Sequence, residues 1–178
     1  MTGMLPFRKA PNLAEFHAAI NSGSDRWYAV CLRITRNAAM AEDAVQDGLV
    51  LAWSKRAQFQ RGAKLDTWIH RIVVNAALQL LRRQRPLADD TQVTDIAVDE
   101  HNTPADVYKH EAMNAELEKC LAELTDLERI CFVLKHIEQW RLKEIANELD
   151  TSVNTIKQGL FRGVRKLRVS MAHWRSEP

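Results

Sequence analysis

The chain has few of the residues that mark cross-linked, fibrous or membrane-spanning proteins. Its 178 residues include three cysteines, five prolines and six glycines. Low proline and glycine exclude a collagen-like chain and a wholly disordered one, and no apolar run approaches the roughly 18 residues that a membrane span needs. Cys31, Cys120 and Cys131 are odd in number and form no C-x-x-C pair, which is typical of reduced thiols. Because 46% of the residues are hydrophobic, the chain can bury a core.

Signals for an enzyme and for secretion are missing as well. The first thirty residues hold no apolar stretch behind a basic start, so we expect a cytoplasmic protein. The six histidines have no metal-ligand spacing. No glycine-rich phosphate loop follows a strand pattern, and no nucleophile-base arrangement can be inferred. We therefore expect no catalysis, no metal and no cofactor.

The net charge of +2 conceals three blocks of different sign. Residues 1–86 carry 13 Lys and Arg against 6 Asp and Glu, residues 87–126 carry 2 against 11, and residues 127–178 carry 10 against 6. Two basic blocks around an acidic connector favour two modules that meet a polyanion. Three ordinary solvated surfaces would give the same counts, so charge alone leaves both interpretations open.

Apolar residues recur at helical spacing along most of the chain, and strand signals are nearly absent. We predict an all-α protein with helical modules over 1–86 and 103–178, joined by a flexible acidic linker over 87–102. Cap chemistry predicts helix starts after Asn12, Ser24, Thr103 and Thr125. Further helices are predicted over 39–57, 65–85, 142–149 and 153–171.

The last two predicted helices have the spacing of a helix-turn-helix. Their short break, Asp150-Thr151-Ser152, would make them cross steeply. The second helix presents amides and cations at its N-terminal end, which suits a reader of the DNA major groove. Its predicted solvent-facing residues are Asn154, Thr155, Lys157, Gln158, Phe161, Arg162 and Arg165. An ordinary helical hairpin with a basic surface would give the same pattern.

The predicted helix 65–85 combines cations, an amide and an aromatic residue. Its apolar stripe is predicted from Leu65, Ile69, Ile72, Val73, Ala76 and Leu80. Opposite this stripe lie Arg71, Asn75, Gln79, Arg82 and Arg83, with Trp68 at the border, after the loop 59–64. Phosphates need cations and an unstacked base needs an aromatic face, so the combination suits single-stranded nucleic acid. A tryptophan beside an apolar stripe also suits a core residue.

The predicted helix 39–57 has an acidic face in an otherwise basic module. Asp43, Gln46 and Asp47 share this face through spacings of three and four. We interpret it as a docking surface for arginines of a protein partner, with a solvated helix face as the alternative. The buried stripe is predicted to consist of Val45, Leu49, Ala52 and Trp53.

Four blocks of sequence carry a family pattern. They are AEDAVQDGLVLAW (41–53), LDTWIHRIVVNAALQLLRR (65–83), LTDLERICFVLKHIE (124–138) and LKEIANELDTSVNTIKQGLFRGVRKLR (142–168). In order and distance they resemble bacterial RNA polymerase sigma factors of the extracytoplasmic-function group of the sigma-70 family. The resemblance implies a region 2 bundle over 1–86 and a region 4 helix-turn-helix over 103–178. It also implies a non-enzymatic factor that binds core RNA polymerase and directs promoter-specific transcription initiation.

The resemblance further implies roles for particular residues. Docking on the β′ coiled-coil of the polymerase would use Asp43, Gln46 and Asp47. Capture of a flipped −10 base and of the opened strand would use Arg61, Gly62, Ala63, Lys64, Trp68, Arg71, Asn75, Arg82 and Arg83. Reading of −35 duplex would use Asn154, Lys157 and Gln158, with Thr155, Arg162 and Arg165 on phosphates. The β flap and an anti-sigma factor are the other implied partners, and membrane insertion is not expected.

The chain departs from the family pattern at several positions. Gln158-Gly159 stands where serine-arginine is usual, Val164 replaces an arginine, Asp150 replaces the glycine of the turn, and Gln79 replaces an aspartate. Glycine inside a helix costs about 1 kcal/mol relative to alanine, which puts the −35 contacts of this helix in question. Two alternatives therefore stay open: a sigma-like decoy that sequesters an anti-sigma factor, and a plain helix-turn-helix repressor.

Overall fold

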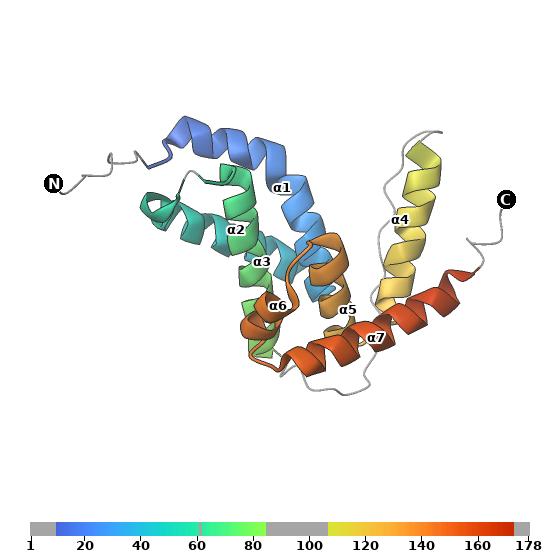
Figure 1. Ribbon diagram of the computed structural model, residues 1–178. Helices are drawn as coiled ribbons and strands as arrows, with labels where there is room; N and C mark the ends of the chain where they lie inside the picture. Colours follow the sequence, from blue (N-terminus) through green and yellow to red (C-terminus); the bar gives the residue numbers. More distant parts are fainter. Residues whose placement is uncertain (1–9, 61, 85–106, 173–178) are drawn as a thin grey trace. The chain divides into compact units, whose positions relative to one another are not determined.

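The computed structural model describes residues 10–60, 62–84 and 107–172 and divides the chain into two compact units, residues 1–81 and 82–178. Over these described ranges all regular structure is helical, as predicted (Figure 1). The predicted linker over 87–102 and the predicted cap Thr103 lie outside the described residues. In the described part of the chain, no helix combines the length and the apolarity of a membrane span.

The first unit is a bundle of three long helices. It contains α1 (Leu13–Thr35), α2 (Ala38–Ser54), a short 3-10 turn η1 (Arg56–Gln58) and all but the last three residues of α3 (Leu65–Gln84). Helices α1 and α2 pack side by side, and α3 lies against both. The Cys31 thiol of α1 is 3.9 Å from the Val73 carbonyl oxygen of α3, and Gly48 of α2 faces the Val73 backbone.

Helix α1 is longer than predicted. Asn12 begins it as expected, because its side chain accepts the Glu15 backbone N–H at 2.9 Å and the Glu15 carboxylate accepts the Asn12 N–H at 2.9 Å. The prediction that Ser24 starts a second helix is wrong, since the chain is helical without interruption. Gly23 lies directly against the indole of Trp27, one turn later, so the glycine makes room for a core ring and does not end the helix.

The buried face of α2 differs from the predicted one. Val45, Leu49 and Trp53 are only half-buried, and Ala52 alone of the predicted stripe is fully buried. The fully buried residues are Met40, Ala41, Ala44, Gly48 and Ala52. A Cβ atom on Gly48 would come within 2.7 Å of the Val73 Cα atom. The two helices therefore approach at backbone distance, and small residues rather than large ones line the contact.

The buried face of α3 is wider than its predicted stripe. Ile69 and Val73 are buried as predicted, whereas Leu65, Ile72, Ala76 and Leu80 are half-buried. The other buried residues are His70, Val74, Ala77, Leu78 and Leu81. Helix α3 packs against two helices, α1 and α2. Its buried surface is therefore wider than that of a helix with one neighbour.

The second unit contains the four remaining helices. They are α4 (Val107–Ala122), α5 (Asp126–Phe132) with a π-helical continuation η2 (Val133–Ile137), α6 (Leu142–Glu148) and α7 (Val153–Ser170). The long helix α7 packs against α5 and α6 and touches α4 (Figure 1). The order of α6 and α7 around a short turn is the predicted helix-turn-helix.

Local signals set the helix ends of this unit as predicted. The Thr125 side chain accepts the Glu128 N–H at 3.4 Å, and the Glu128 carboxylate accepts the Thr125 N–H at 3.1 Å, which completes a capping box at the start of α5. In the turn, Asp150 has a φ of 49°, a left-handed conformation that aspartate tolerates better than most residues. Ser152 then caps α7.

Two glycines form part of the inner face of α7. Gly159 and Gly163 are buried. A Cβ atom on Gly159 would lie 3.3 Å from the Cys131 Sγ atom, and one on Gly163 would lie 3.4 Å from the Glu128 carbonyl oxygen. Gly159 therefore belongs to the packing surface between α5 and α7 and not to the exposed face of the helix.

All three thiols are buried and free. Burial raises the pKa of the Cys131 thiol to about 12. Burial, followed by the nearby carboxylates Glu116 and Glu123, also raises the pKa of Cys120. Protonated, inaccessible thiols are unreactive, so the cysteines act as small core residues.

Candidate nucleic-acid interfaces and docking face

The outer face of α3 carries the residues predicted to hold an opened strand. Arg71, Gln79, Arg82 and Arg83 are exposed, and Trp68 and Asn75 are half-buried. Steps of three and four residues place them along one side of the helix, opposite the buried face. In the preceding loop, Gly62, Ala63 and Lys64 are exposed, while Arg61 lies outside the described residues. The predicted residues therefore lie along one surface.

Trp68 rests on an aromatic support. Its ring centroid is 5.4 Å from that of Phe59, with the planes tilted by 54°. Phe59 is 8% exposed, so it anchors the loop to the core, while part of Trp68 stays open to solvent. Its packing against Phe59 and its partial exposure agree with both interpretations of Trp68, a core residue and a stacking residue. Phe59 was not among the predicted site residues, because only the folded loop brings the two rings together.

The start of this loop is fixed by a second aromatic contact. The Arg56 guanidinium lies 4.1 Å from the centroid of the Trp53 ring and donates to the Trp53 carbonyl oxygen at 2.8 Å. The Trp53 ring makes an edge contact with Phe16 of α1, with centroids 5.2 Å apart. These contacts of Arg56 and Trp53 therefore hold the chain in place where the loop begins.

Asn75 brings an unsatisfied polar atom to the outer face of α3. Its side-chain Oδ1 atom is buried and has no hydrogen-bond partner among the described residues. Leaving a buried acceptor unsatisfied costs about 1–3 kcal/mol. Because the Oδ1 atom is buried, a ligand could satisfy it only if the Asn75 side chain turned outward.

The acidic face of α2 is exposed as predicted. Asp43, Gln46 and Asp47 all face solvent, and no ion pair is formed by either aspartate with another described residue. The face continues into Val50, which is 71% exposed. The exposure of this patch agrees with both interpretations, a docking surface for a basic partner and a solvated helix face.

The outer face of α7 presents most of the predicted duplex-reading residues. Asn154, Lys157, Gln158 and Arg165 are exposed, and Phe161 between them is 71% exposed. Amides and cations on the exposed side of the second helix of a helix-turn-helix are the groups that contact base edges and phosphates.

Thr155 differs from these residues because it takes part in the helix cap. Its backbone N–H donates to the Ser152 Oγ atom at 3.0 Å, and the two hydroxyl oxygens are 2.9 Å apart. Thr155 is half-buried. It lies beside the reading residues but is already hydrogen-bonded within the protein.

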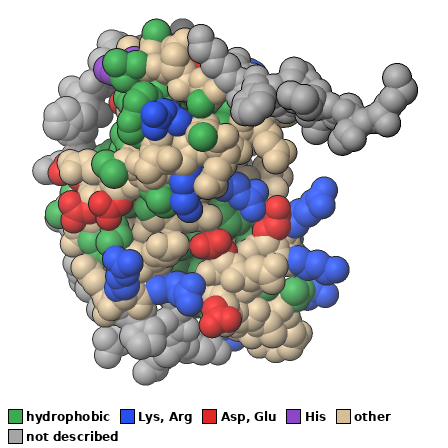
Figure 2. All heavy atoms as spheres, turned by 90° about the vertical axis from the view of Figure 1, so that its left-hand side faces the viewer, with side chains coloured by type: hydrophobic (Ala, Val, Ile, Leu, Met, Phe, Trp, Pro, Cys, Tyr) green, Lys and Arg blue, Asp and Glu red, His purple; other side chains and the backbone are tan. Residues whose placement is uncertain are grey.

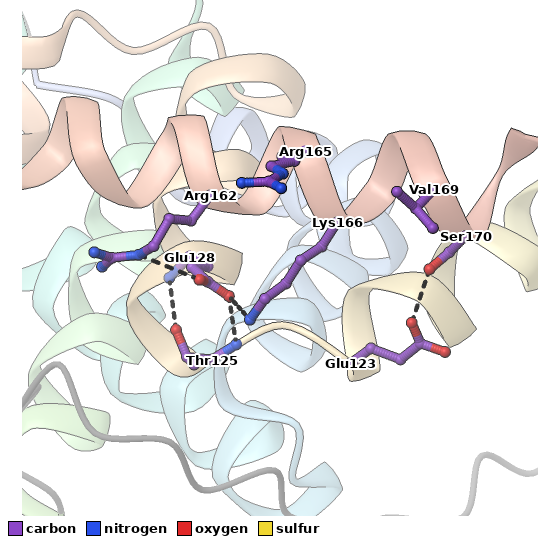
Figure 3. A pocket seen from close by; sticks show the side chains of 8 residues that line it. All are labelled: Glu123, Thr125, Glu128, Arg162, Arg165, Lys166, Val169 and Ser170. Atoms are coloured by element: carbon purple, nitrogen blue, oxygen red, sulfur yellow. Dashed lines mark hydrogen bonds and ion pairs between the residues drawn. The ribbon is translucent and has the colours of Figure 1, made fainter.

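Arg162 also has an internal partner. Its Nε atom is 3.4 Å from the Oε1 atom of Glu128, and the Lys166 Nζ atom is 2.7 Å from the Oε2 atom. Figure 3 shows Arg162 and Lys166 pointing toward this carboxylate, in a groove between α5 and α7. The Glu128 side chain is 3% exposed. One buried carboxylate therefore receives two cations in addition to the Thr125 N–H.

The surroundings keep Glu128 ionised. Burial alone would raise its pKa, but the hydrogen bonds from Lys166 and Thr125, together with the charges of Lys166 and Arg162, lower the pKa below its usual value. Its contribution to stability is therefore present above the unfolded pKa of about 4.3 and is lost as the pH falls through the folded pKa. Sequence spacing marked Glu128 only as a capping residue, because its pairing depends on how α5 and α7 pack.

Charge alone does not single out these surfaces. On the face drawn in Figure 2, basic and acidic side chains are interspersed. Within the described ranges, no group of three or more His, Cys, Asp and Glu side chains is placed to hold a metal ion. Each candidate surface is therefore recognised by the kinds of side chain that share one face of a helix, and not by its net charge.

Two family models match the chain. Sigma-70 region 2 matches residues 20–86, and Sigma-70 region 4 matches residues 114–167. The first match covers most of α1 and all of α2 and α3, and the second covers the helix-turn-helix. The candidate surfaces on α2 and α3 lie within the first match, and that on α7 within the second.

Curated relatives agree with these matches. The chain is 28% identical over 155 residues to the ECF RNA polymerase sigma factor SigW of Bacillus subtilis, covering 81% of this chain and 82% of that protein. It is 27% identical over 161 residues to the ECF RNA polymerase sigma factor SigE of Mycolicibacterium smegmatis, covering 89% of this chain and 62% of that protein. The chain thus spans most of one relative and less than two thirds of the other.

A solved structure has a similar fold. It is the sigma factor RpoE in complex with the anti-sigma factor NepR from Bartonella quintana, with a TM-score of 0.61 and 21% identity. The similarity covers 90% of this chain and 98% of that one. At this identity the likeness concerns the fold.

Proposed function

Since the chain belongs to the extracytoplasmic-function group of the sigma-70 family, we propose that it binds core RNA polymerase and places it at promoters, with the first unit on the −10 element and the second on the −35 element. Factors of this family direct transcription initiation and are not enzymes. The observation that supports the division of labour is that α3 carries Trp68 held against Phe59 beside its exposed arginines, whereas α7 carries its amides and cations on the second helix of a helix-turn-helix.

The first unit would stabilise an opened strand. Extruding a base costs a few kcal/mol, and a surface that contacts only the extruded base shifts the equilibrium toward the open form by its differential affinity. Trp68 would offer a partly accessible ring for stacking, and the half-buried Asn75 would turn its amide toward a base. Phosphate contacts and the loop pocket would come from Arg61, Gly62, Ala63, Lys64, Arg71, Arg82 and Arg83.

The second unit would position the polymerase upstream on duplex DNA. Amides of Asn154 and Gln158 match the donor and acceptor pair of adenine, and Lys157 matches the acceptors of guanine. Arg165 would contact a phosphate. Thr155 and Arg162 lie at the edge of this face and remain proposed phosphate contacts, although each already has a partner within the unit.

Docking on the polymerase would use the acidic face of α2. Asp43, Gln46 and Asp47 would contact the β′ coiled-coil, with Val50 adding apolar area at the end of the patch. The second unit would contact the β flap. Because the RpoE neighbour is a complex with an anti-sigma factor, we also propose that a dedicated anti-sigma factor covers these docking surfaces, and that the protein acts in the cytoplasm with the polymerase.

No observation favours the decoy alternative. The suspicion that Gly159 weakens DNA reading loses its basis, because Gly159 is buried against α5. The residues of the exposed face of α7 retain the amides and cations that a decoy would not need.

Run-off transcription tests the proposal. Purified chain is added to core RNA polymerase on a library of randomised promoters, and the transcribed templates are sequenced. We expect one enriched motif with two parts, and Asn154→Ala is expected to lose sequence preference only in the upstream part. Core polymerase alone is the control. Absence of any enriched motif with the wild-type chain would contradict the proposal and favour the decoy.

A further inference from the structure

The cations of α7 fall into two sets with different surroundings. Arg162 and Lys166, one helical turn apart, both point at the buried Glu128 carboxylate (Figure 3). Lys157, Arg165 and Arg168 are exposed and form no ion pair with other residues of the described ranges. The helix therefore carries two cations that share one buried carboxylate, with side chains 38% and 43% exposed, and three cations without such a partner in the described ranges.

The two sets lie on different sides of the helix. At about 100° per residue, Lys157, Arg165 and Arg168 fall within a quarter turn of one another and share that sector with Asn154. Arg162 and Lys166 are rotated toward the inner face, beside the buried Gly159 and Gly163. The exposed cations thus continue the line of the base-reading residues, and the paired ones border the core.

A cation contributes to DNA affinity by releasing counterions from a phosphate, and each contact steepens the dependence of log K on log salt by about 0.9. A cation already paired with a buried carboxylate has to leave that partner first. Leaving Glu128 buried without its cations is strongly unfavourable. Arg162 and Lys166 should therefore contribute less to DNA binding than their charges suggest.

We propose that Glu128 limits the DNA affinity of α7 by holding the charges of Arg162 and Lys166, so that the phosphate contacts of the helix fall mainly on Lys157, Arg165 and Arg168. This rests on the proposed function, in which α7 binds duplex DNA. A lower affinity for DNA of any sequence raises the ratio of specific to non-specific affinity. This ratio decides how well a promoter competes with the rest of the genome.

The first test releases the paired cations. Binding of full-length wild type, Glu128→Gln and Glu123→Gln to a duplex of random sequence is followed by fluorescence anisotropy between 50 and 200 mM salt. Glu128→Gln is expected to bind roughly three- to tenfold more tightly at the lowest salt, with a salt slope steeper by about one to two. Glu123→Gln is the matched control, because Glu123 accepts a hydrogen bond from the Ser170 hydroxyl at 2.8 Å and holds no cation of α7. Equal or weaker binding by Glu128→Gln would overturn the proposal.

The second test leaves Glu128 intact and so avoids any loss of folding in that variant. Arg165→Ala is expected to flatten the salt slope by about 0.9, and Arg162→Ala by less than half as much. Equal flattening would overturn the inference while leaving the proposed function standing. Failure of the wild-type chain to bind duplex at any of these salt concentrations would overturn both.

Discussion

The outer faces of α3 and α7 differ in how they combine rings, amides and charge. On α3, Trp68 packs against the buried Phe59, and the buried side-chain oxygen of Asn75 has no hydrogen-bond partner in the described part of the chain. On α7, amides stand among exposed cations, and two further cations are held by one buried carboxylate. A supported ring is useful only against an unstacked base, whereas exposed cations and amides suit an intact duplex. In the proposed function, the two faces would therefore bind two states of the same DNA.

The largest expected effect comes from removing the ring of the first face. Trp68→Ala should reduce open-complex formation by roughly 5- to 150-fold, because a stacking contact contributes about 1–3 kcal/mol per base. Permanganate reactivity of unpaired thymines measures the opening, and Trp68→Phe is the control that keeps a ring. Duplex binding through α7 should not change. Normal opening by Trp68→Ala would return this residue to a purely packing role.

A second change separates the two sides of α7. Gly159→Leu should lower the free energy of unfolding by about 1–3 kcal/mol, because the new side chain must displace Cys131 and Leu127 of α5. Thermal melting measures this effect. The neighbouring Gln158→Leu introduces the same side chain on the exposed side, so it should leave the melting temperature nearly unchanged and weaken recognition of cognate duplex. Similar melting of both variants would contradict the assignment of Gly159 to the packing surface.

The smallest of the three effects concerns the acidic face of α2, which contacts protein and not DNA in the proposed function. Reversing both charges, with Asp43→Lys and Asp47→Lys together, should weaken association with core polymerase about tenfold, since a partly exposed ion pair contributes up to about 1 kcal/mol. Association can be measured by fluorescence polarisation of a labelled chain. The exposed Asp25 on α1 provides the control, because Asp25→Lys adds positive charge away from this face. Unchanged affinity of the double variant would leave the patch an ordinary solvated surface.

The sequence was most informative where local chemistry decides the structure. The capping box of Thr125 and Glu128, the left-handed Asp150 and the start of α7 at Val153 all agree with prediction. The side chains involved are within three residues of the backbone groups that they satisfy, so no tertiary contact is needed to recognise them. Helical spacing, which is also a local property, placed the exposed polar residues of α3 and α7 on the correct faces.

Prediction failed where side-chain packing, rather than local cap chemistry, decides the structure. Ser24 resembles a helix start, yet the Trp27 ring covers Gly23 in the core and the helix continues. The buried face of α2 consists of small residues because the Val73 backbone approaches Gly48. The ion pairs of Glu128 depend in the same way on α7 packing against α5 through glycines. None of these contacts leaves a periodic signal in the sequence.

The division of labour between α3 and α7 is tested most directly by transcription from two matched templates, one fully paired and one with the −10 region already unpaired. On the paired template, Trp68→Ala and Asn154→Ala should both reduce initiation with core polymerase. On the unpaired template, Trp68→Ala should regain a large part of its activity, because opening is no longer required, whereas Asn154→Ala should remain as impaired as before. If both variants respond alike to the unpaired region, the two faces do not act on different states of the DNA.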